Sequence, residues 1–101
     1  MLPFQRLQKL NTIGNLWLYI LSLAKGAPIY AYRLQRDIEE KFGFHAGKIT
    51  PYRVLYRLEQ HGLVKSKLKN RKRFYEITDK GRGELAKAKN FYIKMTRLFE
   101  K

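Results

Sequence analysis

Cysteine is absent from the sequence. The chain therefore has no disulfide framework, no thiolate ligand for a metal ion and no cysteine nucleophile. Long apolar runs are absent as well, because no stretch reaches the ~18 residues that a membrane-spanning helix needs. The first residues, MLPFQRLQKLN, lack the apolar core of a signal peptide. We therefore expect a cytoplasmic protein with no membrane segment.

Side chains that could carry out catalysis are scarce. His45 and His61 are the only histidines, and neither has a Cys, Asp or His partner at metal-ligand spacing or a place in a Ser–His–Asp order. The segment Gly81-Arg82-Gly83 is too short for a phosphate-binding loop and does not follow a strand in the required way. We therefore expect no enzymatic activity, no metal ion and no cofactor.

Acidic residues are few. The 101 residues include 8 acidic and 22 basic side chains, which gives a formal net charge of +14. The length suggests one domain, and the hydrophobic share of 45% is ordinary for a globular protein. A charge this positive favours a nucleic acid or another anionic surface as the partner.

The stretch from Ile49 to Thr78 predicts a helix followed by two strands. Thr50 can cap the start of the helix, Pro51 fits its first turn, and Gly62 can end it. Apolar residues recur at helical spacing on one face: Val54, Leu55 and Leu58. Polar and aromatic residues fall on the other face: Tyr52, Arg53, Tyr56, Arg57 and Gln60. A cationic, aromatic helix of this kind fits the major groove of DNA.

The residues after this helix predict a basic hairpin. Apolar or small side chains alternate with lysines, as in a half-buried strand: Val64, Ser66 and Leu68. Phe74 to Thr78 is rich in β-formers and predicts the return strand, with a turn at Asn70-Arg71-Lys72. Six of the nine residues from Lys65 to Arg73 are basic and none is acidic. Packed cations repel each other, so this run favours a polyanionic partner.

Together these elements predict a winged helix-turn-helix that binds double-stranded DNA, with Pro51–His61 as recognition helix and Lys69–Arg73 as wing. Arg53 and Arg57 are the candidates for base or phosphate contacts, with Tyr52 and Gln60 beside them. The full set of candidate DNA-binding residues from this region is Lys48, Thr50, Tyr52, Arg53, Tyr56, Arg57, Gln60, Lys69, Arg71, Lys72 and Arg73. Three alternatives stay open: an RNA-binding winged helix, a protein-interaction winged helix, and a solvated charged face on an ordinary α+β domain.

The residues before Ile49 predict an arm and two helices. Phe4, Leu7 and Leu10 in the arm could form a short amphipathic turn or helix that packs against a partner subunit. Residues 15–24 are apolar almost all round and predict a buried helix. A second helix is expected over Ile29–Phe42, with an apolar stripe at Leu34, Ile38 and Phe42 and with Ala31 one turn earlier.

The residues after Thr78 predict one long helix, capped by Thr78 or Asp79. Apolar residues follow a 3-4-3-4 spacing with two more at their flanks: Leu85, Ala88, Tyr92, Met95 and Phe99, flanked by Phe91 and Leu98. Such a helix would be roughly 33 Å long, whereas a domain of this size has a radius of gyration of about 13 Å. We therefore expect the helix to pair with its counterpart in a homodimer. The alternative is that it folds back on the first helix of its own chain.

Four segments, in this order, are similar to one known family. Gly14-Asn15-Leu16 through Leu23, followed by Lys25-Gly26-Ala27-Pro28, looks like an opening helix and its Gly-x-Pro-like turn. Ile29–Leu34 looks like an H-G-Y-x-L segment, and Tyr52–Val64 is similar to Y-x-x-L-x-x-L-E-x-x-G-L-V. Phe74–Leu85 is similar to Y-Y-x-L-T-x-x-G-x-x-x-L. Over about residues 14–85 the chain resembles the PadR-like winged-helix transcription regulators.

The resemblance implies a dimeric DNA-binding regulator, usually a repressor, that is held together by its C-terminal helix. It also implies that Tyr32 and Tyr52 lie near the DNA. Tyr30 and Ala31 stand where the family usually has His and Gly, so contacts at that turn differ. Many members respond to small aromatic or lipophilic compounds between the subunits, but no residue here supports assigning an effector.

The fold class expected from these observations is mainly α-helical with a small β-hairpin, a winged helix-turn-helix plus a long C-terminal dimerisation helix. We expect an N-terminal arm at residues 1–14, a DNA-binding domain at 15–78 and the dimerisation helix at 79–101.

Overall fold

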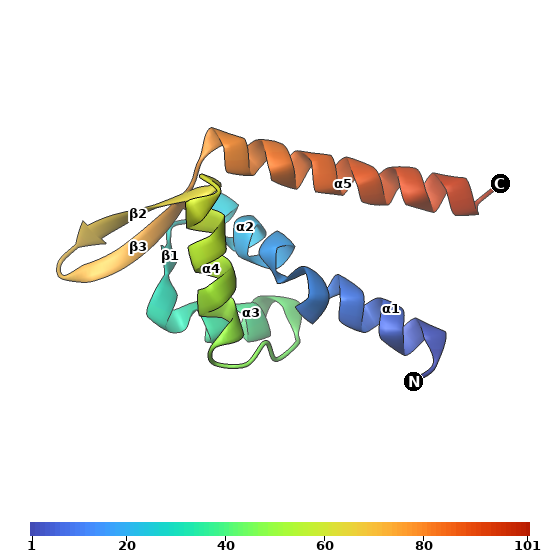
Figure 1. Cartoon of the computed structure of the whole chain (residues 1–101), viewed down its shortest axis with the longest axis horizontal. Helices are drawn as coiled ribbons and strands as arrows, with labels where there is room; N and C mark the ends of the chain where they lie inside the picture. The colour runs from blue at the N-terminus through green and yellow to red at the C-terminus, as the bar shows by residue number, and fades with distance from the viewer.

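The computed structural model describes residues 1–101 as five α-helices, two 3-10 turns and a three-stranded antiparallel sheet (Figure 1). The elements in chain order are α1 (Pro3–Asn11), η1 (Ile13–Asn15), α2 (Leu16–Gly26), β1 (Ile29–Tyr30), η2 (Ala31–Arg33), α3 (Leu34–Phe42), α4 (Thr50–Gln60), β2 (Val64–Lys69), β3 (Lys72–Ile77) and α5 (Asp79–Phe99). The predicted fold class, a mainly helical winged helix with a long C-terminal helix, is confirmed. None of the helices combines the length and the apolar character needed to cross a bilayer.

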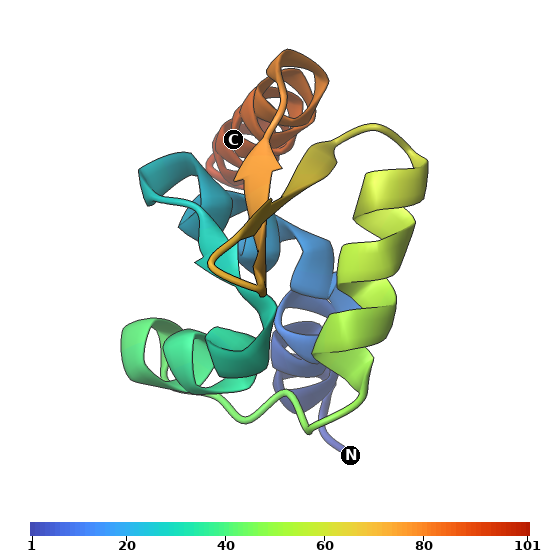
Figure 2. The same cartoon turned by 90° about the vertical axis from the view of Figure 1, so that its left-hand side faces the viewer.

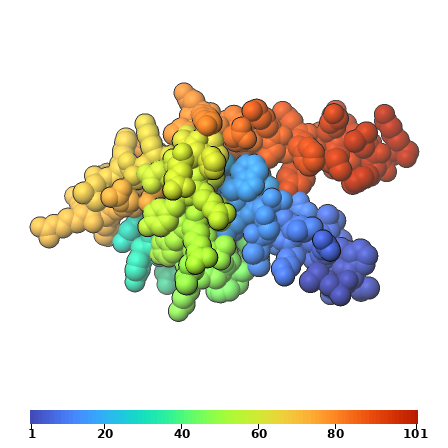
Figure 3. Space-filling model, in the orientation of Figure 1, coloured from blue at the N-terminus to red at the C-terminus, as the bar shows by residue number.

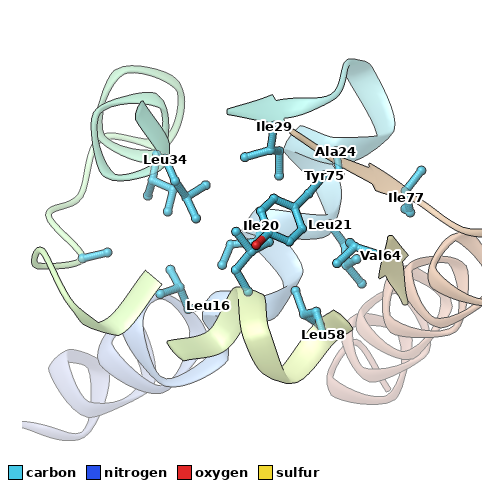
Figure 4. Close-up of a cluster of buried hydrophobic side chains, with 13 residues drawn as sticks. Leu16, Ile20, Leu21, Ala24, Ile29, Leu34, Leu58, Val64, Tyr75 and Ile77 are labelled. Atoms are coloured by element: carbon cyan, nitrogen blue, oxygen red, sulfur yellow. The ribbon is translucent and has the colours of Figure 1, made fainter. Parts of the chain in front are cut away.

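The core forms where α2, α3 and α4 meet the sheet. Tyr75 of β3 is 2% exposed and lies at the centre of this cluster, with side chains of α2 and α4 around its ring (Figure 4). Thirteen buried residues make up the core: Leu16, Ile20, Leu21, Ala24, Ile29, Leu34, Ile38, Ala46, Leu55, Leu58, Val64, Tyr75 and Ile77. Burial of these side chains at about 25 cal/mol per Å² is the main force that fixes α4 against the sheet.

The predicted second helix is wrong at its start. Ile29 and Tyr30 form strand β1, which pairs with Tyr75 and Phe74 of β3, and a 3-10 turn follows before α3 begins at Leu34. The extended backbone of Ile29 completes a sheet edge, so tertiary pairing overrides the helical pattern of the local sequence. The rest of the prediction is confirmed, because Leu34 and Ile38 are buried and Phe42 is half-buried.

The hairpin of β2 and β3 closes with a two-residue turn. Lys69 pairs with Lys72, and the turn residues Asn70 and Arg71 have φ angles of 53° and 64°. Two positive φ angles in a two-residue loop define the turn whose twist matches that of the flanking strands. Lys72 therefore belongs to β3 and not to the turn. Leu68, predicted to lie on a half-buried strand, is 71% exposed because the hairpin extends past the edge of the core.

The two ends of α4 differ in how they are capped. Thr50 does not cap the helix: the preceding Ile49 is already helical, at φ −97° and ψ −41°, and its carbonyl oxygen accepts the first helical bond from Arg53, at 3.2 Å. The C-terminal end stops at Gly62, which has a φ of +74°. The amides of Gly62 and Leu63 donate to the carbonyls of Glu59 and Leu58, a pattern typical of helices that end in glycine.

The start of α5 is fixed against the end of α4. The Thr78 hydroxyl oxygen accepts a hydrogen bond from the Gly81 amide at 3.1 Å and donates one to the Gly62 carbonyl at 2.6 Å, which confirms the predicted cap. Gly81 lies so close to Leu63 that a Cβ added there would overlap the Leu63 carbonyl oxygen. From this point α5 runs away from the sheet, and the molecule extends over 52 × 29 × 21 Å.

Candidate nucleic-acid interface

The outward side of α4 carries two long polar side chains at its centre. Pro51, Leu55 and Leu58 are buried, so the opposite side of the helix faces solvent. Arg53 and Gln60 lie two turns apart on that side and are both exposed. Guanidinium and carboxamide groups are the side chains that read base edges with paired hydrogen bonds.

One flank of α4 faces the sheet. Burial raises the pKa of Tyr75 above its ordinary value; the nearby Glu59 and Tyr56 raise it further and Arg73 lowers it. Arg73 precedes Tyr75 by two residues on β3, so the two side chains point to the same side of the strand. Tyr56 is 57% exposed, and Tyr52, one turn earlier, is half-buried. A tyrosine and an arginine therefore border the space between α4 and the hairpin.

The other flank of α4 faces away from the hairpin. Arg57 is exposed there and lines a shallow hollow together with Ile13, Trp17 and His61. Lys48 and Thr50 lie at the N-terminal end of the helix, and both are exposed. No side chain caps the first amides of α4, so these amides and Lys48 offer positive charge at one point of the surface.

The predicted wing residues divide between two faces of the hairpin. Successive residues of a strand point to opposite sides, so Arg73, Leu68 and Ser66 share the face of Tyr75, which is the face towards α4. The Arg73 guanidinium donates a hydrogen bond to the Ser66 hydroxyl at 3.0 Å and bends back along the strand. The opposite face carries the lysines of the hairpin: Lys65, Lys67, Lys69 and Lys72. The alternation of the sequence indicates Lys65 and Lys67 as cationic wing residues too, although they are absent from the predicted set.

The tip of the hairpin is a cation in a strained backbone conformation. Arg71 has a φ of +64°, in the left-handed region that costs a non-glycine residue about 1–2 kcal/mol. Its side chain is exposed and has no acidic partner. The ion pairs of the chain are Lys67 with Glu76 and Lys87 with Glu84, so most cations of the wing are uncompensated.

An aromatic cluster at the base of the hairpin was not predicted. The Tyr30 ring stacks against Tyr32, with 5.9 Å between ring centres, and lies 5.4 Å from Phe74. The Lys72 ammonium lies 5.3 Å from the centre of the Tyr30 ring, an attraction that holds this lysine against the sheet. Tyr32, which the resemblance places near DNA, is 80% exposed at the outer side of the cluster. The pairing of β1 with β3 creates the cluster, and nothing in the local sequence signals it.

These groups lie around one end of the molecule. Viewed from that end, the hairpin projects towards the viewer between α4 on one side and β1 and α3 on the other (Figure 2). We define the cationic face as the outward and flanking polar residues of α4 together with the exposed cations of the hairpin. Both chain termini lie at the opposite end (Figure 1).

The opposite end carries an apolar groove between α1 and α5, which appears as a hollow between the blue and red helices (Figure 3). Its volume is about 830 Å³. Asn11, the last residue of α1, is hydrogen-bonded to both neighbouring helices. The Tyr92 hydroxyl of α5 donates to its side-chain oxygen at 2.7 Å, and the Tyr19 hydroxyl of α2 donates to its backbone carbonyl.

The apolar residues of α5 have no full cover within one protomer. Leu85, Ala88 and Met95 are half-buried, whereas Phe91 and Phe99 are 59% and 78% exposed. Tyr92 and Leu98 are also exposed, at 38% and 49%. Leu85 packs against the core near α2, but the C-terminal half of α5 runs past the end of α2 (Figure 1). Folding back on the first helix thus covers only the start of the predicted apolar stripe.

The helix-turn-helix formed by α3 and α4, the hairpin beside it and the cationic face define a winged-helix protein. The sequence profile of the "Transcriptional regulator PadR-like family" matches residues 20–87, more than half of the chain. The chain belongs to this family, whose members are DNA-binding transcription regulators and not enzymes. No curated protein matches the chain.

Solved structures of several transcription regulators share the fold. A transcriptional regulator from Clostridium thermocellum superposes with a TM-score of 0.77 at 24% identity, covering 86% of this chain and 88% of the other. A PadR-like regulator from Bacillus cereus superposes with a TM-score of 0.75 at 25% identity, covering 92% and 93%. PadR of Bacillus subtilis, solved in complex with operator DNA, superposes with a TM-score of 0.64 at 19% identity, covering 89% of this chain and 62% of the other.

Proposed function

We propose that this protein is a homodimeric regulator that binds double-stranded operator DNA through the cationic face. The observation that carries the proposal is the separation of surfaces: the outward side of α4 and the cationic hairpin share one end of the molecule, and the uncovered apolar residues of α5 lie at the other. A dimer joined at the second end leaves the first end of each subunit free for DNA.

In the proposed complex α4 enters the major groove. Arg53 and Gln60, at the centre of its outward side, contact base edges or phosphates, and Tyr56 and Arg57 contact the strands on either side. The free amides at the start of α4, with Lys48 and Thr50 beside them, donate hydrogen bonds to a phosphate, as helix N-termini commonly do.

The hairpin lies beside this groove. Arg71 at its tip and the cations Lys69, Lys72 and Arg73 contact the backbone or the adjacent minor groove. Phosphate contacts of this kind set orientation and affinity but not sequence preference. Tyr32, exposed at the edge of the aromatic cluster, is positioned to add a further contact.

A two-fold symmetric dimer implies an inverted repeat. Two copies of α4 would enter successive major grooves about 34–36 Å apart. Binding over a promoter would exclude RNA polymerase, so the proposed role is repression. In this scheme residues 15–78 are the DNA-binding domain, residues 79–101 are the dimerisation helix, and the arm at residues 1–14 packs against the partner subunit.

Single substitutions test the roles assigned to the two elements. On duplexes enriched from a random pool, Arg53→Ala is expected to cost ~1–3 kcal/mol at one base position and relax the preference there, whereas Arg71→Ala weakens all sequences alike and lowers the salt slope by about 1. Lys41→Ala, an exposed cation at the far end of α3, is the matched control and should leave binding unchanged. Unchanged affinity for both Arg53→Ala and Arg71→Ala would remove the assignment.

Salt and competitor titrations separate this proposal from its alternatives. A protein with 6–10 phosphate contacts loses roughly 10³–10⁵ in affinity between 50 and 200 mM salt, whereas a protein-interaction module shows little dependence. Competition between duplex DNA and structured RNA at matched salt distinguishes a DNA from an RNA partner, and preference for RNA would contradict the proposal.

A further inference from the structure

Four basic residues and one asparagine recur at regular spacing along α5 and to the last residue after it. They repeat the spacing of the apolar residues, each two positions later in the sequence: Lys87, Asn90, Lys94, Arg97 and Lys101 follow Leu85, Ala88, Tyr92, Met95 and Phe99. Two positions on an α-helix correspond to about 200° of rotation. We define these five residues as the basic stripe, and it lies almost opposite the apolar residues.

The charge of this stripe is largely uncompensated. Between Leu85 and Phe99 the helix has four basic residues and no acidic one. Lys87 pairs with Glu84 at 3.2 Å, but Lys94 and Arg97 have no acidic partner and are both exposed. Like charges one turn apart, as at these two positions, destabilise a helix by about 0.2–0.5 kcal/mol. The repulsion between Lys94 and Arg97 is therefore not relieved by an ion pair within the protomer, and a polyanion would relieve it.

We propose that the basic stripe binds the phosphate backbone of a second DNA segment, so that the protein bridges two duplexes. The stripe from Lys87 to Arg97 is about 15 Å long, and a duplex carries one charge per ≈ 1.7 Å of its axis, so several phosphates lie within reach. Lys94 and Arg97 lie on α5, which runs away from the cationic face, and both are exposed on the side of the helix opposite Tyr92 and Met95. A dimer that buries Tyr92 and Met95 would therefore leave these two cations accessible.

The same geometry disfavours a membrane surface as partner. A helix that lies on a bilayer must insert its apolar face, and here the exposed part of that face, including Phe91 and Phe99, is assigned to the dimer interface of the proposed function. A polyanion needs only the exposed cations, and it binds without any change in the packing of α5. The chain belongs to a family of DNA-binding regulators. When the cationic face binds one duplex, other DNA segments are the polyanions nearest to the stripe.

The experiment uses the full chain and a random-sequence duplex fixed to beads, with a second, fluorescent random-sequence duplex in solution. Wild-type protein is expected to retain the fluorescent duplex. The double variant Lys94→Gln/Arg97→Gln should capture about tenfold less fluorescent duplex, or less still. The slope of log affinity against log salt concentration for this second duplex should be smaller than in wild type by about 2 per subunit. The control Lys25→Gln/Lys41→Gln removes the same charge elsewhere and should capture as wild type does.

A second background isolates the stripe from the cationic face. In Arg53→Ala/Arg71→Ala protein, a residual duplex affinity should remain, and adding Lys94→Gln/Arg97→Gln should lower that residual affinity further. If Arg53→Ala/Arg71→Ala does not weaken duplex binding at all, the proposed function fails, yet the capture comparison still reports on the stripe. Glutamine is a good helix former and both positions are exposed, so thermal unfolding of the variants should match wild type.

Equal capture by the Lys94→Gln/Arg97→Gln variant and wild type would overturn the proposal. So would a stripe-dependent binding to vesicles of anionic lipid combined with unchanged duplex capture.

Discussion

Replacing Phe99 by alanine tests the proposed dimer interface with a side chain that does almost nothing for the protomer. Phe99 is 78% exposed in one protomer. Fully burying a phenylalanine is worth about 1.5–3 kcal/mol, so covering the exposed part of this ring contributes about 1–2 kcal/mol. A symmetric dimer buries two such rings, which gives about 2–4 kcal/mol and a weakening of the dimer by about 30- to 1000-fold in Kd.

Sedimentation equilibrium over a range of protein concentrations measures this change directly. Phe99→Ala should dissociate the dimer while the unfolding of the protomer at low concentration stays as in wild type. Leu68→Ala serves as the control, because Leu68 is equally apolar and 71% exposed but lies on the hairpin. The reasoning is refuted if wild-type protein is a monomer at micromolar concentration, or if both variants associate as wild type does.

Three further predictions concern the fold. Gly81→Ala would place a methyl group against the Leu63 carbonyl oxygen and should lower the free energy of unfolding by about 1–3 kcal/mol. Gly83 has open space around it, so Gly83→Ala should raise the free energy of unfolding by roughly 0.5–1 kcal/mol. Thermal melts that rank the two variants in the opposite order would contradict this. Thr78→Ala removes the cap of α5 and should cost about 1 kcal/mol by denaturant titration. Arg71→Gly should raise stability by about 0.5–1 kcal/mol, because relief of the positive φ outweighs the greater flexibility of glycine in the unfolded chain. The same variant should weaken duplex binding in an anisotropy assay, and a parallel change in both would be inconsistent with this.

The sequence predicts well those elements whose signals are local. The helical periodicity that ends at Gly62 and the cap at Thr78 identify α4 and α5 to within a residue or two. The chemistry that determines these boundaries lies within a few residues of each of them. The hydrogen bonds that end a helix at a left-handed glycine, and the bond that the Thr78 hydroxyl oxygen accepts from the Gly81 amide, involve only nearby backbone groups.

Prediction from the sequence is wrong or incomplete where contacts between residues far apart in the chain determine the structure. Ile29 and Tyr30 carry a helical pattern but pair with β3, which lies more than forty residues later in the chain. Leu68 alternates like a core residue, but strand alternation cannot tell where the core ends and the free hairpin begins. The division of the wing cations between two faces of the hairpin follows from the register of β2 and β3, and so does the aromatic cluster around Tyr30.

The most direct test of the central claim is a footprint of the protein on duplexes selected from a random pool. If the outward side of α4 and the hairpin of each subunit bind DNA, the footprint will be palindromic, with two protected half-sites centred about 10–10.5 base pairs apart. A pool without enrichment, or a single protected site without symmetry, would contradict the claim.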